Sequence, residues 1–247
     1  MSRSGSMIKT LGWLLRNGFW TPDHLVQAIR YAWARLRHPN VEFEGFCFLG
    51  KRVELTVDAE KAKLIIGRWA HLADGVRLRA HEGVLRVGEK AVLGHDLTVN
   101  CWLDTEIGAR TIIGDRVYVC DFDHVTADPQ VPIKDQGLVK SPVRIGADCW
   151  IASHVVLVRG TDLGDGSVAA AGAVVRGVVP ARSIVAGVPA RVVANRDQRF
   201  ADDAVLRSYV DALGAEAAEQ VRRAMAGGHG IERDKRGVGE DGEVRAD

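Results

Sequence analysis

Two carboxylates and an imidazole lie within four residues in the segment Asp121-Phe122-Asp123-His124. A histidine can accept a proton near neutral pH at one ring nitrogen, while the other nitrogen donates to a carboxylate that fixes the tautomer. The residue types therefore suit a general base. A histidine in a loop is more often simply exposed, so the spacing alone leaves both interpretations open.

Residues 121–142, which begin with this segment, interrupt an otherwise periodic sequence. They are polar and contain Pro129, Pro132, Gly137 and Pro142. A long excursion from a regular scaffold is where binding and catalytic residues are expected. Asp123 falls where the repeat elsewhere has a small or β-branched residue, and a carboxylate in that position needs a hydrogen bond or a cation to compensate it.

The scaffold itself is indicated by a period of six. Aliphatic or small residues recur without a slip at Ile145, Ile151, Leu157, Leu163, Ala169 and Val175. A period of six is neither that of a helix nor that of one continuing strand, and it is typical of a parallel β-helix. Three hexapeptides make one triangular coil, with one aliphatic side chain per side on the axis, and the coils are stabilised by stacking.

The same spacing appears earlier in three groups separated by slips, which we expect to be small bulges at corners. These groups are Ile66, Leu72 and Leu78; Val87, Leu93 and Val99; and Ile107, Ile113 and Val119. The chain is therefore predicted to be mainly β. We expect a β-helix domain over residues 41–194 that carries the loop 121–142.

Helical segments flank the predicted solenoid. Residues 1–40 are expected to form a helical hairpin, with one helix over residues 7–17 and another from Thr21 and Pro22 to about Arg37. In the second helix, apolar residues recur at helical spacing and the other face is basic; the apolar positions are Leu25, Ile29, Trp33 and Leu36, and the basic ones Arg30, Arg35 and Arg37. The hairpin either covers the open edge of the first coil, which we favour, or contacts a membrane surface.

After the repeat, residues 195–226 are expected to form a C-terminal helix, and the Gly-rich, charged residues 227–247 a disordered tail. The formal net charge of +1 gives no indication of nucleic-acid binding. Four scattered cysteines without a Cys-x-x-Cys pair indicate reduced packing residues in a cytoplasmic protein. We find no apolar run of membrane-spanning length and no signal peptide, so a secreted or membrane-spanning protein is not expected.

Several of these motifs together resemble the hexapeptide-repeat acyltransferases. The segments that carry the resemblance occur in the family's order and are residues 112–115, 121–124, 143–154, 171–173 and 185–191. The chain is most similar to the sugar O-acetyltransferase branch, which includes the maltose, galactoside and exopolysaccharide acetyltransferases. The resemblance covers roughly residues 64–194.

The resemblance implies a left-handed parallel β-helix and a homotrimer, with acyl-CoA in the groove between adjacent prisms. It implies acetyl-CoA or another acyl-CoA as donor, a carbohydrate hydroxyl as acceptor, direct transfer and no metal. His124 matches the family's general base, and Asn100 matches an acceptor-contacting residue. We expect one of Asp121 and Asp123 to orient His124 and the other to face the acceptor.

Other residues match the family's binding site for CoA. Trp150 and Ser153 match residues along the pantetheine arm, and Ala171 and Gly172 match a small-residue step beside it. The chain departs from the family near the CoA phosphates, where Arg176 is expected to supply charge. It also lacks a second arginine after the Gly-Val-Pro-x-Arg motif, where Ala194 stands, which leaves Arg191 or Arg196 as a substitute.

Four alternatives stay open at this stage. The acceptor could be an amine, or the donor a longer acyl-CoA. The chain could be a silent solenoid used for assembly. A zinc hydratase of the carbonic anhydrase type is also built on this fold, but it would need converging imidazoles, for which His71, His81 and His95 are the available residues.

Overall fold

The computed structural model describes residues 22–199, of which those up to Arg196 belong to one compact unit. The predicted helix over residues 7–17, the cap at Thr21, most of the expected C-terminal helix and the tail from residue 227 lie outside the described residues. The described part of that C-terminal segment is α3 (Arg196–Arg199).

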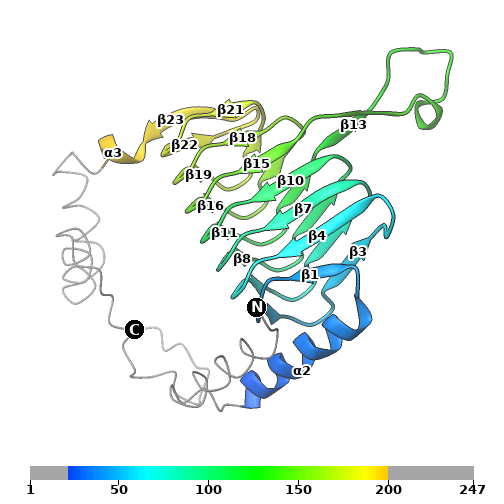
Figure 1. Cartoon of the computed structure of the whole chain (residues 1–247). Coiled ribbons are helices and arrows are strands. Elements are labelled where there is room, and N and C mark those ends of the chain that lie inside the picture. The colour runs from blue at the N-terminus through cyan, green and yellow to red at the C-terminus, as the bar shows by residue number, and fades with distance from the viewer. Residues whose placement is uncertain (1–21, 200–247) are drawn as a thin grey trace, which may run out of the picture. The chain divides into compact units, whose positions relative to one another are not determined.

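Three mainly parallel sheets form the sides of a solenoid, and their strands stack in register from coil to coil (Figure 1). Sheet A contains β1 (Val41–Phe43), β4 (Ala62–Ile66), β7 (Gly83–Val87), β10 (Asp104–Ile107), β15 (Val143–Ile145), β18 (Asp162–Leu163) and β21 (Val178–Val179). Sheet B contains β2 (Phe48–Leu49), β5 (His71–Leu72), β8 (Val92–Leu93), β11 (Ile112–Ile113), β16 (Trp150–Ile151), β19 (Val168–Ala169), β22 (Ser183–Ala186) and β23 (Arg191–Asn195). Sheet C contains β3 (Glu54–Val57), β6 (Arg77–Ala80), β9 (Thr98–Cys101), β12 (Tyr118–Cys120), β17 (Val156–Leu157) and β20 (Val174–Val175).

The predicted hexapeptide positions line the axis of the solenoid. Ile66, Leu72 and Leu78 are fully buried, one on each sheet, and the later groups repeat this placement. Each axis residue pairs with its counterpart one coil away, as in the register Ile113 with Ile151. The slips between the early groups are not bulges. The residues in excess of six between Leu78 and Val87 belong to strands, because β6 and β7 are longer than two residues and are joined by a short corner.

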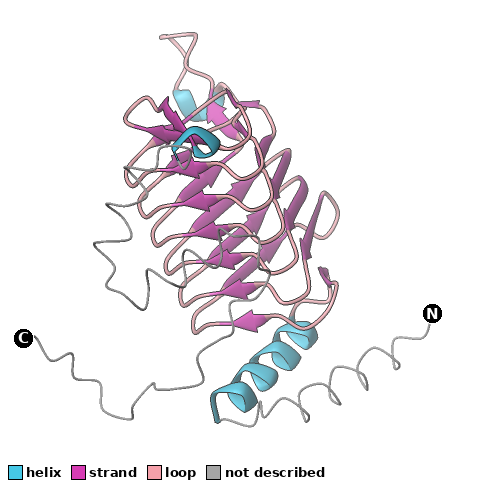
Figure 2. Ribbon diagram, turned by 90° about the vertical axis from the view of Figure 1, so that its left-hand side faces the viewer, coloured by secondary structure: helices cyan, strands magenta, loops and turns pink. Residues whose placement is uncertain are grey.

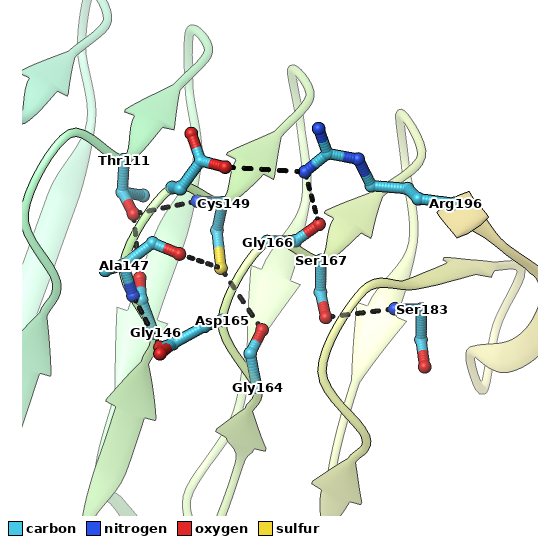
Figure 3. A network of polar contacts seen from close by, with 11 residues as sticks. Thr111, Gly146, Ala147, Cys149, Gly164, Asp165, Gly166, Ser167, Ser183 and Arg196 are labelled. Atoms are coloured by element: carbon cyan, nitrogen blue, oxygen red, sulfur yellow. Dashed lines mark hydrogen bonds and ion pairs between the residues drawn. The ribbon is translucent and has the colours of Figure 1, made fainter. Parts of the chain in front are cut away.

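The edge between sheets A and B, termed the A–B edge, is closed by a column of small buried residues that lie one position before β2, β5, β8, β11, β16 and β19 and at the first position of β22. The column comprises Cys47, Ala70, Ala91, Thr111, Cys149, Ser167 and Ser183. The polar members bond between coils (Figure 3): the Thr111 hydroxyl donates to the Gly146 carbonyl at 2.7 Å and accepts from the Cys149 N–H at 3.1 Å. These bonds satisfy buried polar groups that would otherwise destabilise the corner.

The last coils continue beyond the point where the sequence loses its period. After Val175 the next axis residue is Val179, because the corner shortens to residues 176–177. Strand β22 then keeps the parallel register of sheet B, and β23 turns back antiparallel to it. Arg196 reaches from the end of β23 to the Gly166 carbonyl at 2.6 Å.

Helix α2 (Pro22–Arg37) lies beneath the first coil in both views (Figure 1, Figure 2). The Gln27 side-chain oxygen accepts from the Leu49 N–H at 2.9 Å, and Arg30 donates to the Leu49 carbonyl. Tyr31 packs against Phe43 and Phe46. Helix α2 therefore covers the edge of β2 at Leu49. The side that faces the coil carries Gln27, Arg30, Tyr31 and the buried Ala34. Leu25, Ile29, Trp33 and Leu36 are instead exposed.

Candidate active site

The long excursion leaves the solenoid at the edge between sheets C and A, termed the C–A edge, and projects outward (Figure 1). Its root is an antiparallel hairpin of β13 (Phe122–His124) and β14 (Leu138–Lys140), in which His124 lies opposite Leu138. A 3₁₀ turn, η1 (Ile133–Asp135), lies nearer the tip. His124 is exposed. Pairing of the two strands fixes the backbone of His124 although the rest of the excursion is irregular.

Asp121 anchors this hairpin from beneath. Its side chain is fully buried, and its two carboxylate oxygens accept hydrogen bonds from three consecutive backbone N–H groups at 2.7–2.9 Å, those of Trp102, Leu103 and Asp104. The Thr105 hydroxyl donates to the same carboxylate at 3.3 Å. In the register of sheet C, Asp121 takes the position that Ala80 and Cys101 occupy in the two preceding coils. The carboxylate that points inward is therefore Asp121, whereas the spacing suggested Asp123. It fastens the preceding corner to the hairpin.

Aromatic rings at one position of three successive coils support His124. His81 stacks on Trp102 with centroids 4.7 Å apart, and the Trp102 and Phe122 rings lie 5.9 Å apart. The Phe122 ring is in turn 6.2 Å from the His124 ring, at an interplanar angle of 81°. Edge-to-face contacts of this kind restrict the rings that take part. The imidazole therefore lies at the end of a continuous stack that begins two coils earlier.

An ion pair connects the second strand of the hairpin to the same corner. Lys140 on β14 pairs with Glu82, and its ammonium lies 5.4 Å from the centre of the Trp102 ring. The Lys140 ammonium holds the pKa of Glu82 below its usual range. A shallow hollow of about 400 Å³ lies beside this pair and is lined by Lys61, Glu82, Gly83, Trp102 and Leu103. Polar and aromatic groups thus border open space at the foot of the hairpin.

Asp123 is exposed and pairs with Arg159 in the next C–A corner, with 2.5 Å between the Arg159 Nε and an Asp123 oxygen. Among residues 22–199, neither Asp121 nor Asp123 makes a hydrogen bond to His124. The Asp121 carboxylate accepts from backbone N–H groups, and the Asp123 carboxylate pairs with the Arg159 guanidinium. Asn100 lies on the outer face of β9, where its amide donates to the Tyr118 hydroxyl at 3.1 Å. Burial raises the pKa of Tyr118.

The residues matched to CoA binding gather elsewhere. Trp150 is 55% exposed on β16 of sheet B. Ser153 follows in the edge between sheets B and C, termed the B–C edge, and its carbonyl accepts from the Gly172 N–H at 3.1 Å. Ala171 and Gly172 are exposed, and an added Cβ at Gly172 would meet no atom within 4 Å. The B–C edge therefore presents open backbone at Gly172, in the corner that stacks on that of Ser153.

Two further predicted residues lie near the end of the solenoid. Arg176 is exposed in a C–A corner, and Arg191 is exposed at the start of β23. Sheet C separates the B–C edge, with Ser153, from the C–A edge, with His124. Arg159 follows Ser153 by six positions, a span of at most about 20 Å at the rise of an extended chain. One chain therefore presents the predicted base and the predicted CoA residues on different edges.

Sequence reasoning missed several members of this cluster. The sequence offered His81 only as an imidazole for a zinc site, whereas His81 stacks on Trp102, and neither Lys140 nor Arg159 was singled out. The signal was present in the repeat, since His81, Trp102 and Phe122 each follow an axis residue of sheet C by three positions. Residues at equal distances from the axis positions stack in adjacent coils.

No group of three or more His, Cys, Asp or Glu side chains within residues 22–199 is placed to hold a metal ion. In the same part of the chain, we find no helix with the length and apolar character needed to cross a bilayer.

Comparison with known proteins identifies relatives, although no family model matches the chain. The probable acetyltransferase Rv3034c of Mycobacterium tuberculosis is 46% identical over 205 residues, which make up 83% of this chain and 68% of that protein. WcaF of Escherichia coli K12, a putative colanic acid biosynthesis acetyltransferase, is 28% identical over 194 residues, or 78% and 91% of the two chains.

The fold is shared with a solved structure of lower identity. AntD, an N-acyltransferase from Bacillus cereus in complex with dTDP and 3-hydroxybutyryl-CoA, superposes with a TM-score of 0.58 at 15% identity. The match covers 74% of this chain and 97% of that chain.

Proposed function

The chain belongs to the hexapeptide-repeat acetyltransferases, and on that premise we propose that it transfers acetyl from acetyl-CoA to a carbohydrate hydroxyl with His124 as general base. The observation that carries this proposal is the exposed imidazole at the root of a hairpin that Asp121, Trp102 and Lys140 hold in place. A general base must be held in position and reachable, and His124 meets both requirements.

The proposed reaction is a direct transfer. A ring nitrogen of His124 takes the proton of the acceptor hydroxyl as its oxygen forms a bond to the thioester carbonyl carbon. The tetrahedral intermediate then collapses with cleavage of the carbon–sulfur bond, and the imidazolium returns its proton to the departing CoA thiolate. Our candidate for stabilising the oxyanion is a backbone N–H near Ser153.

A site of this kind needs two chains. The exposed backbone at Gly172, in the corner stacked on that of Ser153, suits a bound pantetheine arm, whereas His124 lies on a different edge of the same prism. We therefore propose a homotrimer, with acyl-CoA between the B–C edge of one chain and the hairpin of the next. In this arrangement Trp150 lines the pantetheine arm, and Arg176 and Arg191 lie toward the phosphates.

We propose that one carboxylate faces the acceptor, as expected, and that the other positions the hairpin instead of contacting the His124 ring. Asp121 acts as a positioning residue for the hairpin, because its oxygens are used by backbone N–H groups. Asp123, paired with Arg159, is the carboxylate that can face an acceptor. We propose that Asn100 contacts the acceptor from the outer face of sheet C.

A carbohydrate acceptor is supported by the relative WcaF, which is named a putative colanic acid biosynthesis acetyltransferase. The four unpaired cysteines support a reducing compartment, the cytoplasm.

A donor and acceptor panel tests this function. The protein is incubated with acetyl-, butyryl- or octanoyl-CoA against neutral sugars, oligosaccharides and amino sugars, while the release of free thiol is followed. We expect acetyl-CoA with a hydroxyl acceptor to give the fastest release and a product ester that is labile to mild base. An amide product, or fastest release from octanoyl-CoA, would replace the proposal with N-acylation or longer-chain transfer.

A further inference from the structure

The outer face of α2 is an apolar stripe that the solenoid does not cover. Leu25, Ile29, Trp33 and Leu36 are 56%, 58%, 59% and 82% exposed, respectively, and the neighbouring Val26 is 41% exposed. At 100° per residue these side chains fall within an arc of about 100° on the helix. Ala34 and Gln27, which face the first coil, lie on the opposite side. The helix therefore packs with one side and presents apolar surface with the other.

Arginines flank this stripe. Arg35 and Arg37 are exposed and lie on its two sides by the same helical geometry. The Arg37 guanidinium lies 5.2 Å from the centre of the Trp33 ring. Long basic side chains beside an apolar stripe can extend toward anionic head groups while their stems stay on apolar surface. A tryptophan at the border between apolar and polar groups is typical of a helix that lies in a membrane interface.

The charge of the chain is concentrated at the same end. Residues 1–40 contain six Lys and Arg residues and one acidic residue, Asp23, a net charge of +5. Since the whole chain carries +1, the remainder carries −4. Three of the six tryptophans, Trp13, Trp20 and Trp33, also fall in residues 1–40. A segment that is basic and rich in tryptophan complements an anionic lipid surface, whereas the rest of the chain does not.

We propose that the exposed stripe of α2 docks on an anionic membrane surface, with the helix lying in the interface. The inference goes beyond the acetyl transfer proposed above and does not depend on it. Burial of the stripe supplies the hydrophobic part of binding, and Arg35 and Arg37, which flank it, supply the electrostatic part. The solenoid remains on the water side, because it packs on the opposite face of α2.

Vesicle flotation with the full chain tests the proposal. The vesicles are made of phosphatidylcholine with or without phosphatidylglycerol, at low and at raised salt. We expect the wild type to float with the anionic vesicles and to be released by salt. The double variant Ile29→Glu, Leu36→Glu should lower the bound fraction by about tenfold or more, because it places two charges in the apolar face. Arg35→Ala with Arg37→Ala should lower it by about tenfold.

The matched control is a pair of Val-to-Glu changes at the other end of the solenoid, Val178→Glu with Val193→Glu, at positions that are 79% and 62% exposed. It introduces the same charge and should bind vesicles like the wild type. Equal loss in both double variants would overturn the proposal. Absence of wild-type binding would also overturn it, as would binding that appears only after residues 2–20 are deleted. The proposal would also be overturned if the α2 variant dissociated an oligomer but left vesicle binding unchanged. The stripe would then be covered by a second copy of the chain.

Discussion

The A–B edge and the C–A edge belong to the same prism but differ in how far their length can vary. From residues 44–47 to residues 164–167, six successive A–B corners have four residues each. The C–A corners range from two residues, as at 81–82, to the excursion of residues 121–142. At the A–B edge, buried Thr111, Cys149 and Ser167 bond from coil to coil (Figure 3). An edge closed in this way has no room for an insertion, whereas the C–A edge carries the hairpin and its ion pairs.

Removal of the Asp121 carboxylate should have the largest effect on stability, because it anchors the variable edge. Asp121→Ala leaves three backbone N–H groups without their acceptor, and we expect the free energy of unfolding to fall by about 2–4 kcal/mol. Turnover should fall as well, since the corner that carries Trp102 is released. Urea unfolding followed by circular dichroism measures the loss, and Asp121→Asn, which keeps one acceptor, should lose less. Stability within about 0.5 kcal/mol of the wild type would remove the anchoring role.

A change at the A–B edge should affect stability alone. Thr111→Val keeps the shape but leaves the Cys149 N–H and the Gly146 carbonyl unpaired, so we expect a loss of about 2 kcal/mol. Thr111→Ser retains the hydroxyl and should lose less. The kcat of both variants should equal that of the wild type once the proteins are folded. A tenfold fall in kcat for Thr111→Val would break the distinction between the two edges.

Two tryptophans allow a matched test of the aromatic stack. Trp102 lies at the C–A edge against His81 and Phe122, whereas Trp69 lies in an A–B corner against Phe46 and Phe48. We expect Trp102→Ala to lower kcat/KM by about tenfold because the support of the Phe122 and His124 rings is lost. Trp102→Phe should restore part of the activity. Trp69→Ala should lower the melting temperature without changing kcat/KM, and equal kinetic effects at both sites would contradict the assignment.

The smallest effect is expected for the thiols. Burial raises the pKa of Cys47 and Cys101 to about 12, and raises that of Cys120 and Cys149. At pH 8 the folded protein should therefore react with a thiol reagent at a small fraction of the rate of the unfolded protein, in which all four react. The unfolded chain loses these protons first as the pH rises above about 9. The thiols therefore contribute stability below that pH, and the contribution declines toward pH 12. Fast reaction of the native protein would contradict this.

Much of the fold could be predicted from the sequence because the repeat is strict. The hexapeptide spacing identified the axis residues of the regular coils, and Pro22 marked the start of α2. The hairpin β13–β14 was not predicted, since Phe122–His124 is too short to show an alternating pattern. Whether the apolar stripe of α2 faces the solenoid or faces outward was left open, because residues at helical spacing do not indicate what covers them.

The candidate site could be predicted only in part. The spacing pointed to Asp123 as the inward carboxylate, but the buried residue is Asp121. The strands of sheet C extend two residues beyond the axis position, to Ala80 and Cys101, and Asp121 occupies the same position in the next coil. Contacts that connect neighbouring coils, such as Lys140 with Glu82, span long sequence separations and depend on register. His124 became the candidate base because it follows two carboxylates at the start of an interruption, a signal that does not depend on strand register.

Turnover of His124→Ala tests the central claim most directly. Its thiol release from acetyl-CoA with the best acceptor of the panel should be about 10²–10⁴-fold slower than that of the wild type. CoA affinity and unfolding free energy should be unchanged, because the side chain is exposed. Val139→Ala on the facing strand of the hairpin is the control and should keep wild-type turnover. Turnover of His124→Ala within tenfold of the wild type would contradict the account.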